Sequence, residues 1–157
     1  MQMTVTLQIN APVEEVFQLL TEPEQVRRWM PTLESTETVS TPDDGSVVGT
    51  RFRQRIRSAN SSMNQVGTTV TTYEGVVTEY EPPDWFAVRV GNHLLLMESR
   101  YELSRGPGDS TDLQCVTETR FTHWLMRWFG WLMNKAMHLG MTRHLQSLKR
   151  VAEANAR

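Results

Sequence analysis

The sequence predicts an α+β fold in which a curved, seven-stranded antiparallel sheet surrounds a long C-terminal α-helix, with two short helices after the first strand. Six strand-like runs follow one another with short turns between them, which favours an antiparallel meander over a parallel sheet with helical crossovers. The chain then becomes helical from about Trp124 to Ala154. Its 157 residues have the length of one domain, 1–157.

The N-terminal part supplies the first strand and the two short helices. Thr4–Ile9 alternates polar and apolar residues, as a half-buried strand does. Pro12 suits a first helical turn, and apolar residues then recur at helical spacing: Val13, Val16, Phe17 and Leu20. Pro23 opens a second short helix that carries Val26, Trp29 and Met30, and Pro31 ends it.

The remaining strands lie between turn-forming residues. We expect them near 33–40, 48–58, 65–80, 85–90, 93–104 and 111–121, with bends at 43–45, 59–62, 82–84, 91–92 and 106–109. One long helix is the only element of adequate length to cover this sheet. We therefore expect a cavity of a few hundred Å³ between sheet and helix, the size that binds small ligands.

Composition excludes several classes of protein. A formal net charge of −2 argues against nucleic-acid binding, which needs concentrated positive charge. The single cysteine, Cys115, cannot form an internal disulfide, and no basic-then-apolar leader or long apolar run is present. These features indicate a cytoplasmic protein. Known zinc and phosphate-loop signatures are missing, and His138 and His144 point to different sides of the helix, so we expect no metal and no cofactor.

Several segments, in order, resemble the START-like superfamily (SRPBCC), in its polyketide cyclase/dehydrase and lipid-transport branch. They are Ile9–Phe17 (Ile-Asn-Ala-Pro-Val-Glu-Glu-Val-Phe), Val26, Trp29 and Pro31, Gly49-Thr50, Tyr80-Glu81-Pro82-Pro83, and Leu145-x-x-Leu148-Lys149. The resemblance spans nearly the whole chain and implies the helix-grip (START/Bet v 1-like) fold. It does not select a function, because the family includes lipid and hormone binders, aromatase/cyclases and quinone-binding proteins.

Strand alternation divides each run into an inward and an outward set. Arg51, Arg53, Arg55 and Arg57 alternate with Phe52, Gln54 and Ile56. Four unpaired arginines are too costly to bury, so we place them on the solvent face, where they either pair with carboxylates or bind an anionic partner. In 65–80 either Tyr73, Gly75 and Val77 or Val76, Thr78 and Tyr80 face inward, and a bulge would exchange the two sets.

The predicted lining of the cavity is apolar with a few uncharged polar groups. The predicted ligand-binding residues are Trp29, Phe52, Gln54, Phe86, Val88, Leu95, Met97, Ser99, Tyr101, Cys115, Thr117, Met133, Met137 and Met141. His93 begins the inward set of its run and is a further candidate. For Ser99, Cys115 and Thr117, and for the methionine stripe, ordinary core packing explains the pattern equally well.

The segment Trp124–Trp131 is apolar nearly all round, with three tryptophans and one arginine. It has three interpretations: a helix buried against both the sheet and the small helices, a homodimer contact, or a transient membrane contact.

The sequence is consistent with more than one function. The first hypothesis is binding of a small hydrophobic molecule, either a lipid or an aromatic or polyketide-like compound. The alternative is a polyketide cyclase/dehydratase-type enzyme, in which Tyr101 would act as general acid or oxyanion donor, assisted by Gln54 or His93. A protein-interaction module is the third. A pair of inward ionisable residues within hydrogen-bonding reach would favour the enzyme, and a filled core the interaction module.

Overall fold

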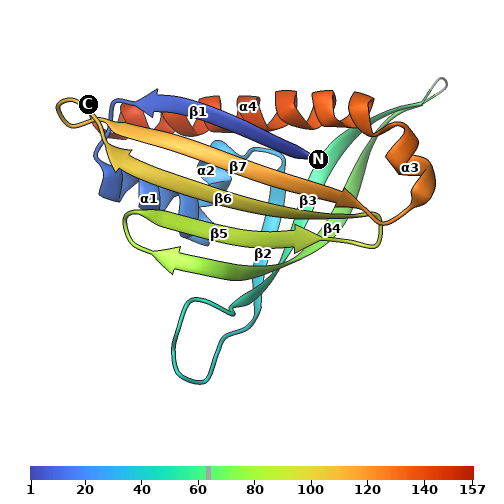
Figure 1. Cartoon of the computed structure of the whole chain (residues 1–157), viewed down its shortest axis with the longest axis horizontal. Coiled ribbons are helices and arrows are strands. Elements are labelled where there is room, and N and C mark those ends of the chain that lie inside the picture. The colour runs from blue at the N-terminus through green and yellow to red at the C-terminus, as the bar shows by residue number, and fades with distance from the viewer. Residues whose placement is uncertain (63–64) are drawn as a thin grey trace.

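The computed structural model describes residues 1–62 and 65–157 and contains the predicted sheet (Figure 1). Its strands are β1 (Gln2–Ile9), β2 (Leu33–Ser40), β3 (Arg51–Ser62), β4 (Gln65–Glu81), β5 (Trp85–Gly91), β6 (Leu95–Arg105) and β7 (Thr111–Phe121). They form one antiparallel sheet in the order β1-β7-β6-β5-β4-β3-β2. The predicted fold class is therefore confirmed.

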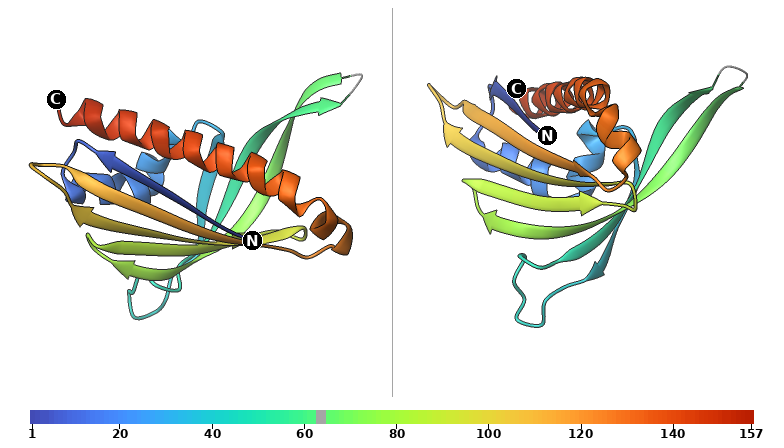
Figure 2. Two further views of the ribbon diagram at one scale, coloured as in Figure 1. Left: turned by 45° about the horizontal axis from the view of Figure 1, so that its top comes forward. Right: turned by 45° about the vertical axis from the view of Figure 1, so that its right-hand side comes forward.

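Four helices complete the chain: α1 (Val13–Thr21), α2 (Pro23–Trp29), α3 (Trp124–Trp128) and α4 (Gly130–Asn155). Figure 2 shows α4 lying lengthwise over the curved sheet, with α1 and α2 beside its C-terminal half and α3 at the opposite end. The two small helices pack on each other and on α4, so they close only one end of the sheet.

The end of the sheet beside α1 and α2 is a solid core. The predicted apolar face of α1 is buried there, together with Leu145, Leu148 and Ala152 of α4. Two buried hydrogen bonds fix the small helices: Trp29 Nε1 donates to the Leu19 carbonyl over 2.7 Å, and Thr111 Oγ1 donates to the Ala11 carbonyl over 2.8 Å. Burial of these apolar side chains supplies the main stabilisation of this end.

Two segments differ from the sequence prediction. β3 continues through residues 59–62, where a bend is expected, and pairs with β4 as far as Ser62 opposite Gln65. The connecting residues 63–64 lie outside the described part of the chain. The predicted C-terminal helix is divided at Phe129 (φ −93°, ψ 9°), which separates α3 from α4. Gly130 follows the break, and glycine is the least helix-favouring residue after proline.

Of the three interpretations of the Trp124–Trp131 segment, burial against both the sheet and the small helices is wrong. α3 packs against β7 and α4, at the far end from α1 and α2, and has no buried residue. Of the described helices, none has the length and apolar character that crossing a bilayer requires.

Gly75 of β4 allows the Phe52 ring to lie directly over the backbone, because a Cβ at Gly75 would stand 2.3 Å from Phe52 Cζ. We expect Gly75→Ala to lower the free energy of unfolding by about 1–3 kcal/mol, the cost of overpacking a filled position. Gly140→Ala is the matched control: its Cβ would meet no atom within 4 Å, and alanine favours a helix interior. We expect it to raise stability by about 0.5–1 kcal/mol. Urea unfolding measures both, and equal effects would contradict the packing argument.

Candidate functional site

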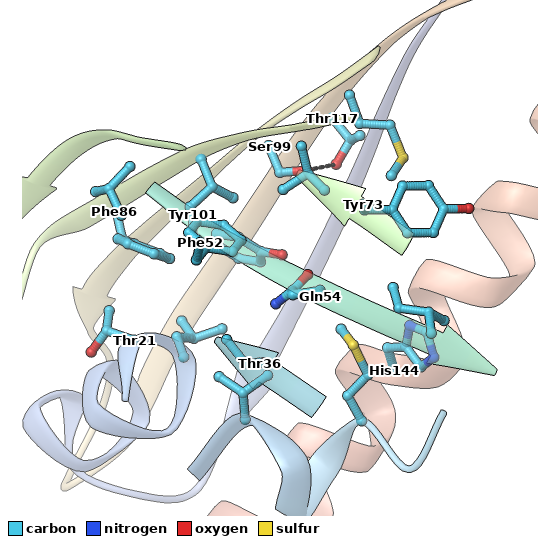
Figure 3. Close-up of a pocket in the computed structure, with 18 of the residues that line it drawn as sticks. Thr21, Thr36, Phe52, Gln54, Tyr73, Phe86, Ser99, Tyr101, Thr117 and His144 are labelled. Carbon is cyan, nitrogen blue, oxygen red and sulfur yellow. Dashed lines mark hydrogen bonds between the residues drawn. The ribbon is translucent and has the colours of Figure 1, made fainter. Parts of the chain in front are cut away.

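A cavity of about 620 Å³ lies between the concave face of the sheet, α2 and the N-terminal half of α4 (Figure 3). The sheet contributes these lining residues: Met3, Thr36, Thr38, Phe52, Gln54, Ile56, Tyr73, Val77, Tyr80, Phe86, Val88, Val90, Leu95, Met97, Ser99, Tyr101 and Thr117. The helices and loops contribute Leu20, Thr21, Pro23, Val26, Trp29, Met30, Val47, Thr50, Met133, Met137, Gly140, Met141 and His144. None of these side chains is Asp, Glu, Lys or Arg.

Strand alternation positions the lining as predicted for β3. Phe52, Gln54 and Ile56 face the cavity, and the intervening arginines lie on the exposed side of the sheet. Arg53 pairs with Glu74 (Nε–Oε1 3.1 Å), and Arg57 pairs with Glu34 (Nη2–Oε1 2.7 Å). The hydrogen bond from Arg57 lowers the pKa of Glu34. Three of the four arginines on this solvated face, Arg53, Arg55 and Arg57, therefore pair with carboxylates of neighbouring strands, and such exposed pairs contribute little to stability.

A bulge in β4 explains why residues from both of its expected inward sets line the cavity. Tyr73, Gly75 and Val77 form the inward set up to a register shift between Val77 and Glu79. Beyond the shift Tyr80 also faces inward, because one extra residue exchanges the two faces of a strand. Tyr80 then joins a row of aromatic rings, with centroids 5.5 Å from Phe17 and 6.4 Å from Phe86. This row marks the boundary between the solid core and the cavity.

All the predicted ligand-binding residues line the cavity except Cys115. Cys115 lies beside Tyr101 on the neighbouring strand but belongs to the buried core, with its Sγ 3.7 Å from Thr117 Oγ1. His93, the further candidate, is exposed in the turn between β5 and β6 and does not reach the cavity. It precedes the first paired residue of β6, so the alternation that places Leu95 inward does not extend to it.

Sequence reasoning missed His144, which lines the cavity near its α2 side (Figure 3). Its Nε2 lies 3.4 Å from Thr32 Oγ1, and burial lowers the pKa of its imidazole. A signal was present, because His144 follows Met137 and Met141 by seven and three residues, the spacing of one helix face. The threonines of the lining, Thr21, Thr36, Thr38 and Thr50, were also missed.

The polar groups at the centre of the cavity are neutral. Ser99 Oγ and Thr117 Oγ1 share a hydrogen bond of 3.0 Å. Burial raises the pKa of Tyr101 well above its ordinary value and raises that of Cys115 to about 11. The Gln54 carboxamide points into the cavity and forms no hydrogen bond with any described residue. Gln54 is thus available to bond an uncharged polar group of a ligand, and the Tyr101 hydroxyl, which has a side-chain hydrogen bond with Cys115, is the second neutral donor of the lining.

Nothing among residues 1–62 and 65–157 gathers three His, Cys, Asp or Glu side chains in a cluster that could hold a metal ion. Tyr101 of the lining forms a side-chain hydrogen bond with Cys115, which lies outside the lining, and no two described residues of the lining form an ionisable pair joined by a hydrogen bond. The chemistry that remains is exclusion of water and hydrogen bonding by neutral donors and acceptors.

With this fold and cavity, the chain belongs to the family described as polyketide cyclase/dehydrase and lipid transport, which matches residues 1–153. Among curated proteins, no sequence matches this chain.

Solved structures share its fold at low sequence identity. A START superfamily protein from Mycobacterium smegmatis superimposes with a TM-score of 0.75 at 15% identity, over 98% of this chain and 97% of that one. The protein TTHA0849 from Thermus thermophilus has a TM-score of 0.71 at 17% identity, over the whole of both chains. The di-domain ARO/CYC BexL of the BE-7585A biosynthetic pathway has a TM-score of 0.69 at 17% identity, over 98% of this chain and 50% of that one.

Burial of His144 predicts a loss of stability in weak acid. Because its pKa is lower in the folded than in the unfolded chain, folding favours the neutral ring. The stabilisation that the neutral His144 ring contributes to the unfolding free energy is therefore fully present above pH 6.5, and it is lost as the pH falls through the folded-state pKa. We expect His144→Gln to reduce the fall in unfolding free energy between pH 7 and pH 5, measured by urea titration. His138→Gln, on the exposed side of the same helix, should behave as the wild type; an unchanged slope in His144→Gln would contradict the assignment.

Cys115 is expected to be chemically inert in the folded protein. Its side chain is 1% exposed, and a pKa of about 11 leaves almost no thiolate at pH 8. Reaction with Ellman's reagent should proceed only after denaturant is added. Rapid modification of the native protein would show that the strands beside Cys115 open readily.

Proposed function

We propose that this protein binds an uncharged, mostly apolar small molecule in the cavity between sheet and α4, as a carrier. The observation that supports this most strongly is the cavity itself: about 620 Å³, lined mainly by apolar and aromatic side chains. That volume lies within the usual range of small-molecule pockets, about 300–1,000 Å³.

The lining limits the chemistry of the ligand. A carboxylate or ammonium group inside the cavity would meet no opposite charge, and burying an unpaired charge costs several kcal/mol. An uncharged carbonyl or hydroxyl group would instead find Gln54 and the Tyr101 hydroxyl. Met133, Met137 and Met141 form the helical wall, and flexible methionine side chains adapt to the shape of an apolar guest.

The alternative is a cyclase/dehydratase acting on a polyketide-like substrate in the same cavity, and Tyr101 is the observation that favours it. Its phenol is protonated at neutral pH, and burial raises the pKa further, so the hydroxyl can donate a hydrogen bond to a carbonyl oxygen on which charge develops. We place the carrier first because no two described residues of the lining form a hydrogen-bonded ionisable pair; Cys115, which bonds Tyr101, is buried outside the lining. If a substrate turns over, Tyr101→Phe should lower kcat; unchanged turnover would remove Tyr101 from that role.

The carrier proposal is tested by native mass spectrometry of the purified protein, followed by denaturing extraction. A stoichiometric apolar passenger is the expected result. Purified protein stripped of any passenger is then titrated with the uncharged apolar probe N-phenyl-1-naphthylamine, whose fluorescence rises on transfer from water.

Two tryptophan substitutions on adjacent positions of α4 provide the matched comparison. Met137→Trp fills the cavity and should weaken probe binding at least about tenfold, a loss of about 1.4 kcal/mol. Ala136→Trp points to solvent and should bind as the wild type. Circular dichroism verifies that both variants fold. Equal affinity in the two variants would place the probe outside the cavity and contradict the proposal.

A further inference from the structure

α3 and the start of α4 lie at one end of the molecule (Figure 2), and a cluster of their apolar side chains is exposed to solvent. We name it the tryptophan tip: Trp124, Leu125, Trp128, Phe129, Trp131 and Leu132. Trp128 and Trp131 are 76% and 73% exposed. Leu94, also exposed, lies beside the tip, since its carbonyl accepts a hydrogen bond from the Thr122 backbone. Contiguous apolar surface of this kind marks a contact with another surface.

The charge around the tryptophan tip has one sign. Residues 119–152 contain no Asp or Glu, although the whole chain has a formal net charge of −2. Arg127, Lys135 and Arg143 are exposed on α3 and α4 and form no ion pair within the described part of the chain. On the sheet face, by contrast, Arg53, Arg55 and Arg57 are paired with glutamates, and Arg51 alone of the four arginines forms no ion pair with a described residue. The cations near the tip are therefore free for an external anion.

We propose that the tryptophan tip docks onto an anionic lipid bilayer. Tryptophan side chains favour the boundary between headgroups and acyl chains, and lysine and arginine beside them are attracted to anionic headgroups. The combination of exposed aromatic and leucine side chains with unpaired cations is typical of helices that lie in a membrane interface. The tip thus anchors the protein to the membrane surface without crossing it.

A second copy of this chain is a poorer partner. A two-fold symmetric dimer built on the tip would place the same patch against itself. Arg127 and Lys135 would then approach their own copies, and no carboxylate in residues 119–152 could neutralise them. An anionic bilayer supplies the missing negative charge.

The tryptophan tip and one wall of the cavity share the helix α4. Met133 and Met137 line the cavity from the helix α4, whose first exposed turn carries Trp131 and Leu132. Docking through the tip would hold this end of α4, and with it the cavity wall, beside the bilayer. The docking proposal itself rests only on the exposed surface and its charge, so it stands or falls independently of the carrier function.

Vesicle flotation tests the proposal directly. Wild-type protein is mixed with vesicles of phosphatidylcholine alone or of phosphatidylcholine with phosphatidylglycerol, at low and high salt. We expect flotation with the anionic vesicles at low salt, at least about tenfold weaker partitioning into neutral vesicles, and weakening by salt. Tryptophan fluorescence of the bound protein should shift to the blue.

Three variants identify the surface involved. Trp128→Ser/Trp131→Ser removes the apolar contact, and Arg127→Glu/Lys135→Glu reverses the charge; each should lower partitioning at least about tenfold. Trp85→Ser, on β5 away from the tip, is the control and should float as the wild type. All substituted tip positions are exposed, and thermal unfolding verifies that each variant is folded.

Two results would overturn the proposal. One is wild-type protein that does not float with anionic vesicles. The other is a dimer in sedimentation velocity that Trp128→Ser/Trp131→Ser converts to a monomer, which would assign the tip to a second copy of the chain.

Discussion

Leu145, Leu148 and Ala152 anchor the C-terminal half of α4 to the rest of the fold. Where this contact ends along α4, the solid core ends and the cavity begins. These side chains pack against β1, α1 and α2, which close one end of the sheet. Toward its N-terminus α4 continues over the sheet without a further small helix beneath it. The methionines there reach toward the strands but do not fill the space, so the solid core gives way to the cavity.

The two faces of the sheet separate charged from neutral side chains. Arginine and glutamate pairs occupy the outer face of the sheet, where water solvates them, and none of these residues enters the lining. Inside, the hydroxyls of Ser99 and Thr117 satisfy each other, and burial keeps Tyr101 protonated. A cavity with this lining excludes ions and retains a few groups able to orient a neutral guest.

α4 thus has two different surfaces along its N-terminal half. One carries Met133, Met137 and Met141 toward the cavity, and the other carries exposed aromatic and basic residues. The break at Phe129 turns α3 away from the line of α4, and the tryptophans on either side of it, Trp124, Trp128 and Trp131, remain exposed. A continuous helix would not place these residues at the end of the molecule in the same way.

The sequence by itself determined the element order, the antiparallel meander and most inward-facing residues. These depend on local periodicity, and an alternating strand such as β3 has only one side on which Arg53 and Arg57 can be solvated. The family resemblance independently supported the same fold, and the match over residues 1–153 agrees with it.

Only the tertiary structure decided the remaining features, because they depend on contacts between distant segments. The bulge after Val77 sets which face Tyr80 joins, and the place of His144 depends on Thr32 and α2. Cys115 alternates correctly with Thr117 and lies beside Tyr101 on the same face, but it is covered by the solid core, and alternation does not encode where the core ends and the cavity begins. The exposure of the tryptophan tip likewise follows from where the small helices pack, which is at the other end of the sheet.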